Sequence, residues 1–86
     1  MKHNLKIFDS YFDAILQGLK TFEIRKNDRG YMEGDELLLH EIINVEPTTY
    51  TGRVIYCKVP YITTAYQRKG YIVMSIKDAE LINGDK

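Results

Sequence analysis

The sequence predicts an α+β fold that is mainly β: a small, mixed β-barrel of five to six strands with one short N-terminal helix. Three observations predict it. Apolar and polar residues alternate in several short segments, which is typical of half-buried strands. Turn-forming residues separate these segments at short intervals. Apolar residues at helical spacing occur in one early segment, which predicts a single helix. Several strands, one early helix and frequent turns together indicate a barrel whose strands are mostly antiparallel.

The bulk properties describe one small domain. The 86 residues predict a single domain over 1–86, with its core at about 3–77 and a C-terminal tail at 78–86. Twelve basic and twelve acidic residues give a net charge of zero, so any nucleic-acid binding must come from a local patch. The lone cysteine, Cys57, excludes an internal disulfide and is expected to be buried and inert. No signal core or membrane span is evident, which predicts a cytoplasmic protein, monomeric by default.

The N-terminal third predicts a strand followed by a helix of about two turns. Residues 5–8 form the strand candidate, and Ser10 with Asp13 resembles a capping box at the helix start. Gly18 supplies a left-handed C-cap. The apolar stripe of this helix, at spacings of three and four, is Phe12, Ile15, Leu16 and Leu19.

The next strand, residues 21–25, has two different faces. Because side chains in a strand alternate with period two, Phe22 and Ile24 share one face, which is predicted to meet the core. The polar residues on and just before this strand are Lys20, Thr21, Glu23 and Arg25.

The remaining strands follow from alternation and turn signals. Residues 36–43 form a strand whose leucine run indicates that both faces are covered. Residues 44–52 are expected to form a polar hairpin loop, and residues 52–63 the longest strand. Because proline cannot donate to a sheet ladder, this strand is expected to bend, bulge or become an edge at Pro60.

The C-terminal part completes the sheet. Residues 71–77 form the last main strand, with Ile72, Met74 and Ile76 on its core face. Much earlier in the chain, between two predicted turns, Tyr31 and Met32 are expected to pack against the barrel. A further short strand at 81–82 is expected within the tail, which then frays.

The pattern Gly18-x-Lys20-x-x-Glu23-x-Arg25 resembles the signature of the ASCH family of small β-barrels related to PUA RNA-binding domains. Flanking matches extend the resemblance over about residues 3–77, toward a subfamily of short bacterial and phage ASCH-like proteins. The resemblance implies a PUA-like barrel topology. With this resemblance, the leading hypothesis is a non-catalytic PUA-like module whose cleft holds RNA or a nucleotide-like ligand.

The polar strand face is the predicted floor of that cleft. Lys20 and Arg25 would contact an anionic or carbonyl-bearing group, the arginine through its planar fork. Glu23 would accept hydrogen bonds from the ligand or hold Arg25 in place, and Thr21 offers a hydroxyl. The plainer alternative is a solvated strand face on which Glu23 and Arg25 only pair with neighbouring side chains.

Aromatic and basic residues alternate in the penultimate loop. Tyr61, Tyr66 and Tyr71 flank Arg68 and Lys69, and single-stranded RNA readers stack bases on such rings. The alternative is that tyrosines wrap the barrel as ordinary strand residues. His3 and His40 lack further ligands at metal spacing, so neither a metal nor a cofactor is expected.

Two other functions remain open. One is a small amidohydrolase or nuclease that acts on modified nucleosides or RNA through Lys20 and Glu23 as acid and base. In the ASCH relatives that hydrolyse acetylated cytidine, the resemblance implies a threonine three residues after the lysine, and here that residue is Glu23. The other function is a protein-interaction module that uses the surface tyrosines.

Overall fold

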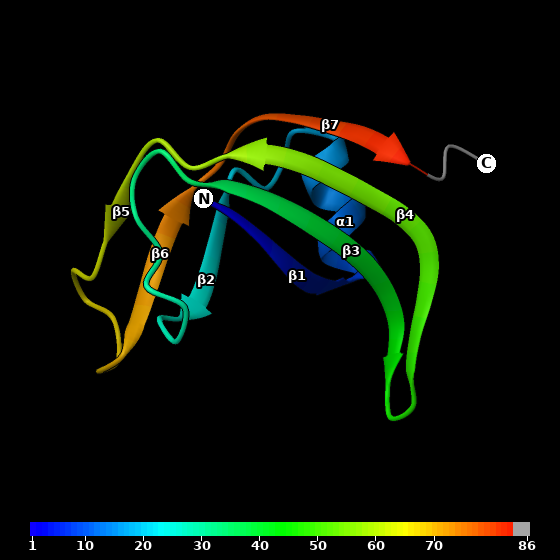
Figure 1. Ribbon diagram of the computed structural model, residues 1–86, viewed down its shortest axis with the longest axis horizontal. Helices are drawn as coiled ribbons and strands as arrows, with labels where there is room; N and C mark the ends of the chain where they lie inside the picture. The colour runs from blue at the N-terminus through cyan, green and yellow to red at the C-terminus, as the bar shows by residue number, and fades with distance from the viewer. Residues whose placement is uncertain (84–86) are drawn as a thin grey trace.

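The computed structural model describes residues 1–83 and contains seven strands and one helix (Figure 1). A four-stranded sheet has the order β1-β3-β4-β7, and a three-stranded sheet has the order β2-β6-β5. The elements are β1 (Lys2–Phe8), α1 (Asp9–Leu16), β2 (Phe22–Lys26), β3 (Glu36–Val45), β4 (Thr48–Lys58), β5 (Ile62–Thr63), β6 (Tyr71–Ser75) and β7 (Lys77–Asn83). The predicted mainly-β fold with one short N-terminal helix is confirmed, but these strands form two open sheets instead of a closed barrel.

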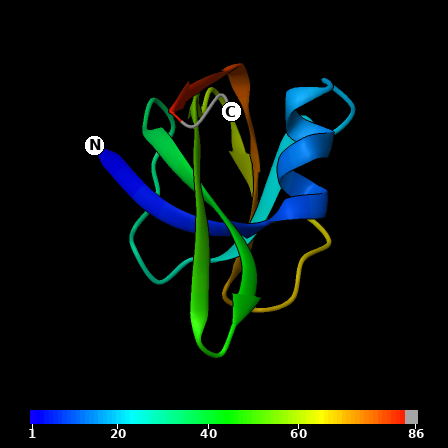
Figure 2. The same cartoon turned by 90° about the vertical axis from the view of Figure 1, so that its right-hand side faces the viewer.

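The two sheets enclose one core with the helix. Strand β1 pairs with β3 in parallel, and the other strand pairs are antiparallel. Helix α1 lies on one side of the four-stranded sheet, where it contacts β1, β3 and β7 (Figure 2). Both sheets and the helix contribute to the buried cluster, whose largest fully buried side chains include Phe12, Leu37, Leu39, Ile55 and Met74.

Helix α1 is shorter than its apolar stripe. Phe12 and Ile15 are buried as predicted, but the helix ends at Leu16 and leaves Leu19 76% exposed. The predicted capping box is wrong: Phe8 is the N-cap residue and makes no side-chain capping bond. Asp13 instead pairs with Arg53, at 2.9 Å. Gly18 adopts the expected left-handed conformation, with φ +75°.

Strand β3 extends further than predicted, and β4 begins and ends earlier than the predicted strand at 52–63. The polar loop expected at 44–52 is wrong, because pairing continues to Val45 and Thr48 and leaves only residues 46–47 in the turn. The hairpin therefore curls away from the body of the molecule (Figure 1). The leucine run is covered fully on one face only, since Leu37 and Leu39 are buried while Leu38 is half-buried.

The predicted irregularity at Pro60 is present, and there the chain passes from one sheet to the other. Strand β4 ends at Lys58, and β5 pairs with β6 in the other sheet. The core face of β6 is confirmed, because Ile72, Met74 and Ile76 are all buried. Tyr31 is buried as expected, whereas Met32 is 69% exposed.

The C-terminal segment is part of the sheet. The short strand expected at 81–82 is present as β7, which spans Lys77–Asn83 and pairs with β4. The frayed end predicted for the tail falls on residues 84–86, which lie outside the described residues. Within residues 1–83, no helix is long and apolar enough to cross a membrane.

Two buried carboxylates stabilise the connections of the four-stranded sheet. Asp35 accepts hydrogen bonds from the Met32 backbone N–H at 2.9 Å and from His3 Nε2 at 2.8 Å. Glu41 accepts a bidentate pair from Arg53, at 2.8 and 2.9 Å. Neither pairing could be predicted from the sequence, because Glu41 pairs with Arg53 and Asp35 with His3, both far away along the chain.

Candidate functional site

Strand β2 faces the core with its polar side. Glu23 is 5% exposed, whereas Phe22 and Ile24 are 42% and 50% exposed. The predicted alternation is present, but the predicted orientation is wrong. An ionised carboxylate can occupy the buried face because neighbouring cations compensate it.

Lys20 and Arg25 provide this compensation, and with Glu23 they form the Lys20–Glu23–Arg25 cluster. Lys20 Nζ donates to Glu23 Oε1 at 2.6 Å, and Arg25 Nε donates to Glu23 Oε2 at 2.7 Å. The three side chains are 15%, 6% and 24% exposed in that order. Both carboxylate oxygens are therefore engaged. Of the two predicted roles for Glu23, this geometry fits the one that holds Arg25, and Glu23 holds Lys20 as well.

Arginine side chains join this cluster to the free edge of β1. Arg25 Nη2 donates to the Lys6 carbonyl oxygen at 2.7 Å, and Arg29 Nη1 donates to the Asn4 carbonyl oxygen at 2.9 Å. Strands β1 and β2 are edge strands of different sheets. The guanidinium groups satisfy backbone acceptors that a neighbouring strand would otherwise pair.

Two adjoining clefts open over the cluster. The first, the Phe22 cleft, has a volume of about 280 Å³ and is lined by Tyr11, Lys20, Phe22, Glu23 and Ile24. The second, the Tyr71 cleft, has a volume of about 340 Å³. Its lining residues are Lys6, Ile7, Phe8, Tyr11, Glu23, Ile24, Arg25, Lys26 and Tyr71. Tyr11, Glu23 and Ile24 line both clefts, so the two clefts adjoin, and each is close to the lower end of the volume range of ligand sites.

The lining of the two clefts is basic and aromatic. Four basic residues and one acidic residue line them in a chain that is neutral as a whole. Tyr11 is 54% exposed and Phe8 is 40% exposed. Lys20 Nζ lies 5.6 Å from the Tyr11 ring centroid and 4.8 Å from that of Phe22. The two clefts therefore form a local basic and aromatic patch on a chain that is neutral as a whole.

The structure brings some of the predicted ligand residues together and separates others. Tyr71 lines the second cleft, and Arg68 stacks on it with its guanidinium carbon 4.9 Å from the ring centroid. Tyr66 is fully exposed at a positive φ of 59°, and neither it nor the exposed Lys69 lines either cleft. Thr21 lines neither cleft; it borders a separate depression beside α1.

Seven residues that line the clefts had no predicted site role, namely Lys6, Ile7, Phe8, Tyr11, Phe22, Ile24 and Lys26. One signal was available in α1. Since Phe12 begins the buried stripe, its neighbour Tyr11 must point away from the helix–sheet contact. Phe22 was not predicted as a ligand contact because it was expected on the core face of β2, whereas the structure leaves it 42% exposed.

The remaining candidates for reactive or metal chemistry are structural. Burial raises the pKa of the Cys57 thiol to about 12, with a further contribution from the Glu23 carboxylate, so the buried thiol stays protonated at neutral pH. His40 Nε2 hydrogen-bonds to Asn4 Oδ1 at 2.8 Å. Within the described part of the chain, no three His, Cys, Asp or Glu side chains are close enough to hold a metal ion.

Comparison with known proteins gives a family and a phage relative. Residues 2–76 match the family described as "Domain of unknown function (DUF3850)". The chain is also similar to a protein of Escherichia phage P2 described as "Uncharacterized 12.9 kDa protein in GpA 3'region". The two are 39% identical over 61 residues, which is 71% of this chain and 53% of the phage protein. The chain thus aligns with about half the length of that relative, and both clefts lie within the family match.

Proposed function

This chain belongs to the DUF3850 family, and we propose that it is a PUA-like module that binds single-stranded RNA or a nucleotide-like ligand in the two clefts over Lys20, Glu23 and Arg25. The observation that carries the proposal is the lining of these clefts. They combine exposed aromatic rings with an excess of positive charge on a neutral protein. Bases stack on such rings and phosphates pair with such cations, so both parts of a nucleotide have partners.

Separate parts of the site would hold the base and the phosphate. The exposed Tyr11 ring lies between the clefts and can support a base from either side. Lys6 and Lys26, at the rim of the Tyr71 cleft, can pair with phosphate. Arg25 uses two of its N–H groups on Glu23 and the Lys6 carbonyl, which leaves donors of its fork for the ligand.

A PUA-like ancestry, implied by the motif from Gly18 to Arg25, is part of the proposal. The two sheets resemble a barrel opened between β1 and β2, where Arg25 and Arg29 bond to β1 carbonyl groups in place of a strand ladder. The helix directly after the first strand and the mixture of parallel and antiparallel pairs support this relation.

Binding is favoured over hydrolysis by the geometry of the cluster. Both Glu23 oxygens accept short hydrogen bonds from cations, so this carboxylate is poorly available as a general base. Thr21, the nearest nucleophile candidate in the sequence, borders the depression beside α1, which Lys20 also lines but Glu23 does not. Lys20 and Arg25 are therefore proposed as ligand contacts, with Glu23 as the residue that positions them.

The affinity for hexauridylate, measured by fluorescence anisotropy, tests this function. We expect binding that weakens about tenfold between about 50 and 200 mM salt, because two or three phosphates are neutralised. Tyr11→Ala should weaken binding by about tenfold through the loss of one stacking ring. Tyr11 is 54% exposed, so its replacement leaves the core intact.

Tyr61→Ala is the matched control for this experiment. Tyr61 is 59% exposed, like Tyr11, but it lines neither cleft. Its replacement should leave the affinity unchanged. Equal losses in both variants, or no binding at millimolar protein, would rule out RNA recognition by these clefts.

A further inference from the structure

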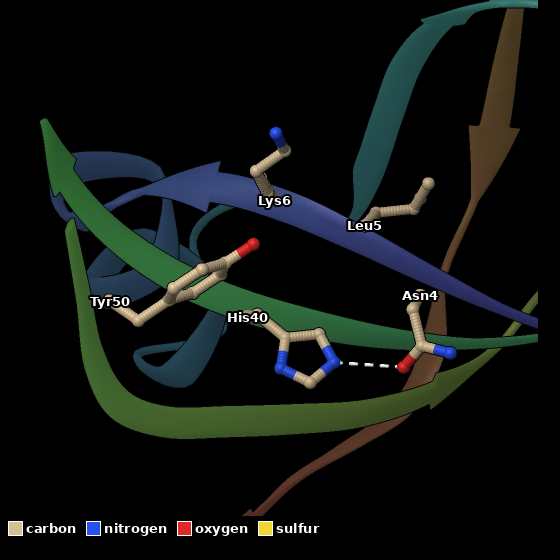
Figure 3. Close-up of a pocket in the computed structure, with 5 residues that line it drawn as sticks. All are labelled: Asn4, Leu5, Lys6, His40 and Tyr50. Carbon is tan, nitrogen blue, oxygen red and sulfur yellow. Dashed lines mark hydrogen bonds between the residues drawn. The ribbon is translucent and has the colours of Figure 1, made fainter. Parts of the chain in front are cut away.

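We propose that the outer face of the four-stranded sheet contains a second site for a base. The ligand would then contain at least two linked nucleotides. This inference rests on the proposed function and deepens it. The second site, the His40 pocket, has a volume of about 390 Å³ and is lined by Asn4, Leu5, Lys6, His40 and Tyr50 (Figure 3).

Polar side chains from three strands meet in the His40 pocket. Lys6 on β1 lies opposite His40 on β3, and Asn4 lies two residues before Lys6 on the same face. His40 Nε2 donates to Asn4 Oδ1 at 2.8 Å. The Tyr50 ring stands edge-on to the His40 ring, with centroids 6.3 Å apart (Figure 3). The hydrogen bond and the ring pair fix the arrangement of the pocket before any ligand arrives.

A small apolar layer supports the two rings. Ile42 and Val54 are 4% and 9% exposed, yet they do not belong to the main core cluster. They are the cross-strand partners of Tyr50 and His40 respectively. The β3–β4 register shifts between these two pairs, as it does at a β-bulge, and Gly52 has a φ of +93° in this segment. Bulges of this kind re-aim side chains, and here Tyr50 is placed beside His40.

Lys6 connects the His40 pocket to the proposed RNA site, because it lines both this pocket and the Tyr71 cleft. Residues of β1, an edge strand, line both hollows. An ammonium group between two base sites is the position expected for the phosphate that links two nucleosides. One base would then lie in the Tyr71 cleft, and the next would lie against Tyr50.

The pocket can read a base as well as stack on it. Tyr50 is 55% exposed and can offer a ring face to a base. Asn4 Oδ1 accepts from His40, which leaves the two Nδ2 hydrogens of Asn4 to donate to a carbonyl oxygen of a pyrimidine. A ribodinucleotide therefore fits the chemistry of the joined sites better than a mononucleotide.

The test compares uridine 5′-monophosphate with uridylyl-uridine, UpU, by calorimetry on the intact protein. We expect UpU to bind about tenfold more tightly, the gain from one further stacked base. Tyr50→Ala should abolish this advantage and leave the affinity for the mononucleotide unchanged. Tyr61→Ala, an equally exposed tyrosine outside both sites, should leave both affinities unchanged.

The outcomes separate this inference from the function on which it rests. If both ligands bind with equal affinity, or if the Tyr50→Ala variant still binds UpU more tightly than the mononucleotide, the proposal of a second base site is wrong. The proposed binding in the two clefts would be unaffected by either result. If neither ligand nor a longer RNA binds, the proposed function fails first. Circular dichroism is the control that shows whether the Tyr50→Ala variant is folded.

Discussion

Replacing Arg53 with alanine is expected to lower the free energy of unfolding by about 3 kcal/mol, because it leaves a buried carboxylate without its partner. Glu41 is 3% exposed and accepts two hydrogen bonds from the Arg53 guanidinium, which holds the pKa of this carboxyl below its usual value. The guanidinium also pairs with Asp13 on α1 and lies 4.6 Å from the Phe12 ring centroid. One side chain thus connects the helix to β3 and β4.

Urea denaturation measures this effect, with Lys58→Ala as its control. Lys58 and Asp78 form an exposed pair at 3.8 Å, each side chain 56% exposed, and such pairs contribute less than about 1 kcal/mol. Arg53→Ala should therefore lower stability far more than Lys58→Ala. Equal effects would show that the Arg53–Glu41 contact does not tie the helix to the sheet.

Replacing Asp35 with alanine is expected to cost about 3 kcal/mol at neutral pH, since it removes an acceptor from two buried donors. Asp35 is 6% exposed and accepts from the Met32 backbone N–H and from His3. These bonds, the Met32 N–H above all, lower the pKa of the Asp35 carboxyl from 3.8 to about 2.

The lowered pKa of Asp35 also predicts a pH dependence. The folded state binds the proton more weakly than the unfolded chain, so the stabilisation is complete above the unfolded pKa of 3.8. It is lost as the pH falls through about 2, and it amounts to about 2 kcal/mol. Asp35→Ala should therefore lose less stability than the native chain between pH 5 and pH 2. The control is Asp28→Ala, at an exposed position, for which stability should depend on pH as in the native chain. If the stability of Asp35→Ala showed the native pH dependence as well, the stabilising role of the Asp35 carboxylate would be contradicted.

The order and type of the elements could be predicted because they depend on local pattern. Alternation located β6, and the three- and four-residue spacing located α1. Gly18 marked the reversal between α1 and β2 because its left-handed conformation is disfavoured in other residues. The hairpin between β3 and β4 was predicted, but the extent of its strands was missed because residues 44–52 are polar and pair beyond the core, where burial leaves no hydrophobic pattern.

The site was predicted in its composition but not in its orientation. Period-two alternation separates the faces of a strand without stating which face is buried, and hydrophobicity favoured the wrong one for β2. Glu23 is buried because Lys20 and Arg25 are close enough in sequence to neutralise it. Tyr11 and Lys6 join the site from α1 and β1, and only the packing of the two sheets brings them there.

An amide-shift NMR titration with hexauridylate, and with plain and acetylated cytidine, tests the central claim most directly. The account predicts shifts that saturate and cluster at Lys20 to Arg25, Tyr11 and Tyr71, and that weaken as salt is added. Shifts confined to β4 and β7, or none for any ligand, would contradict it. Conversion of acetylated cytidine during the titration would also contradict it, because the Lys20–Glu23 pair would then be catalytic.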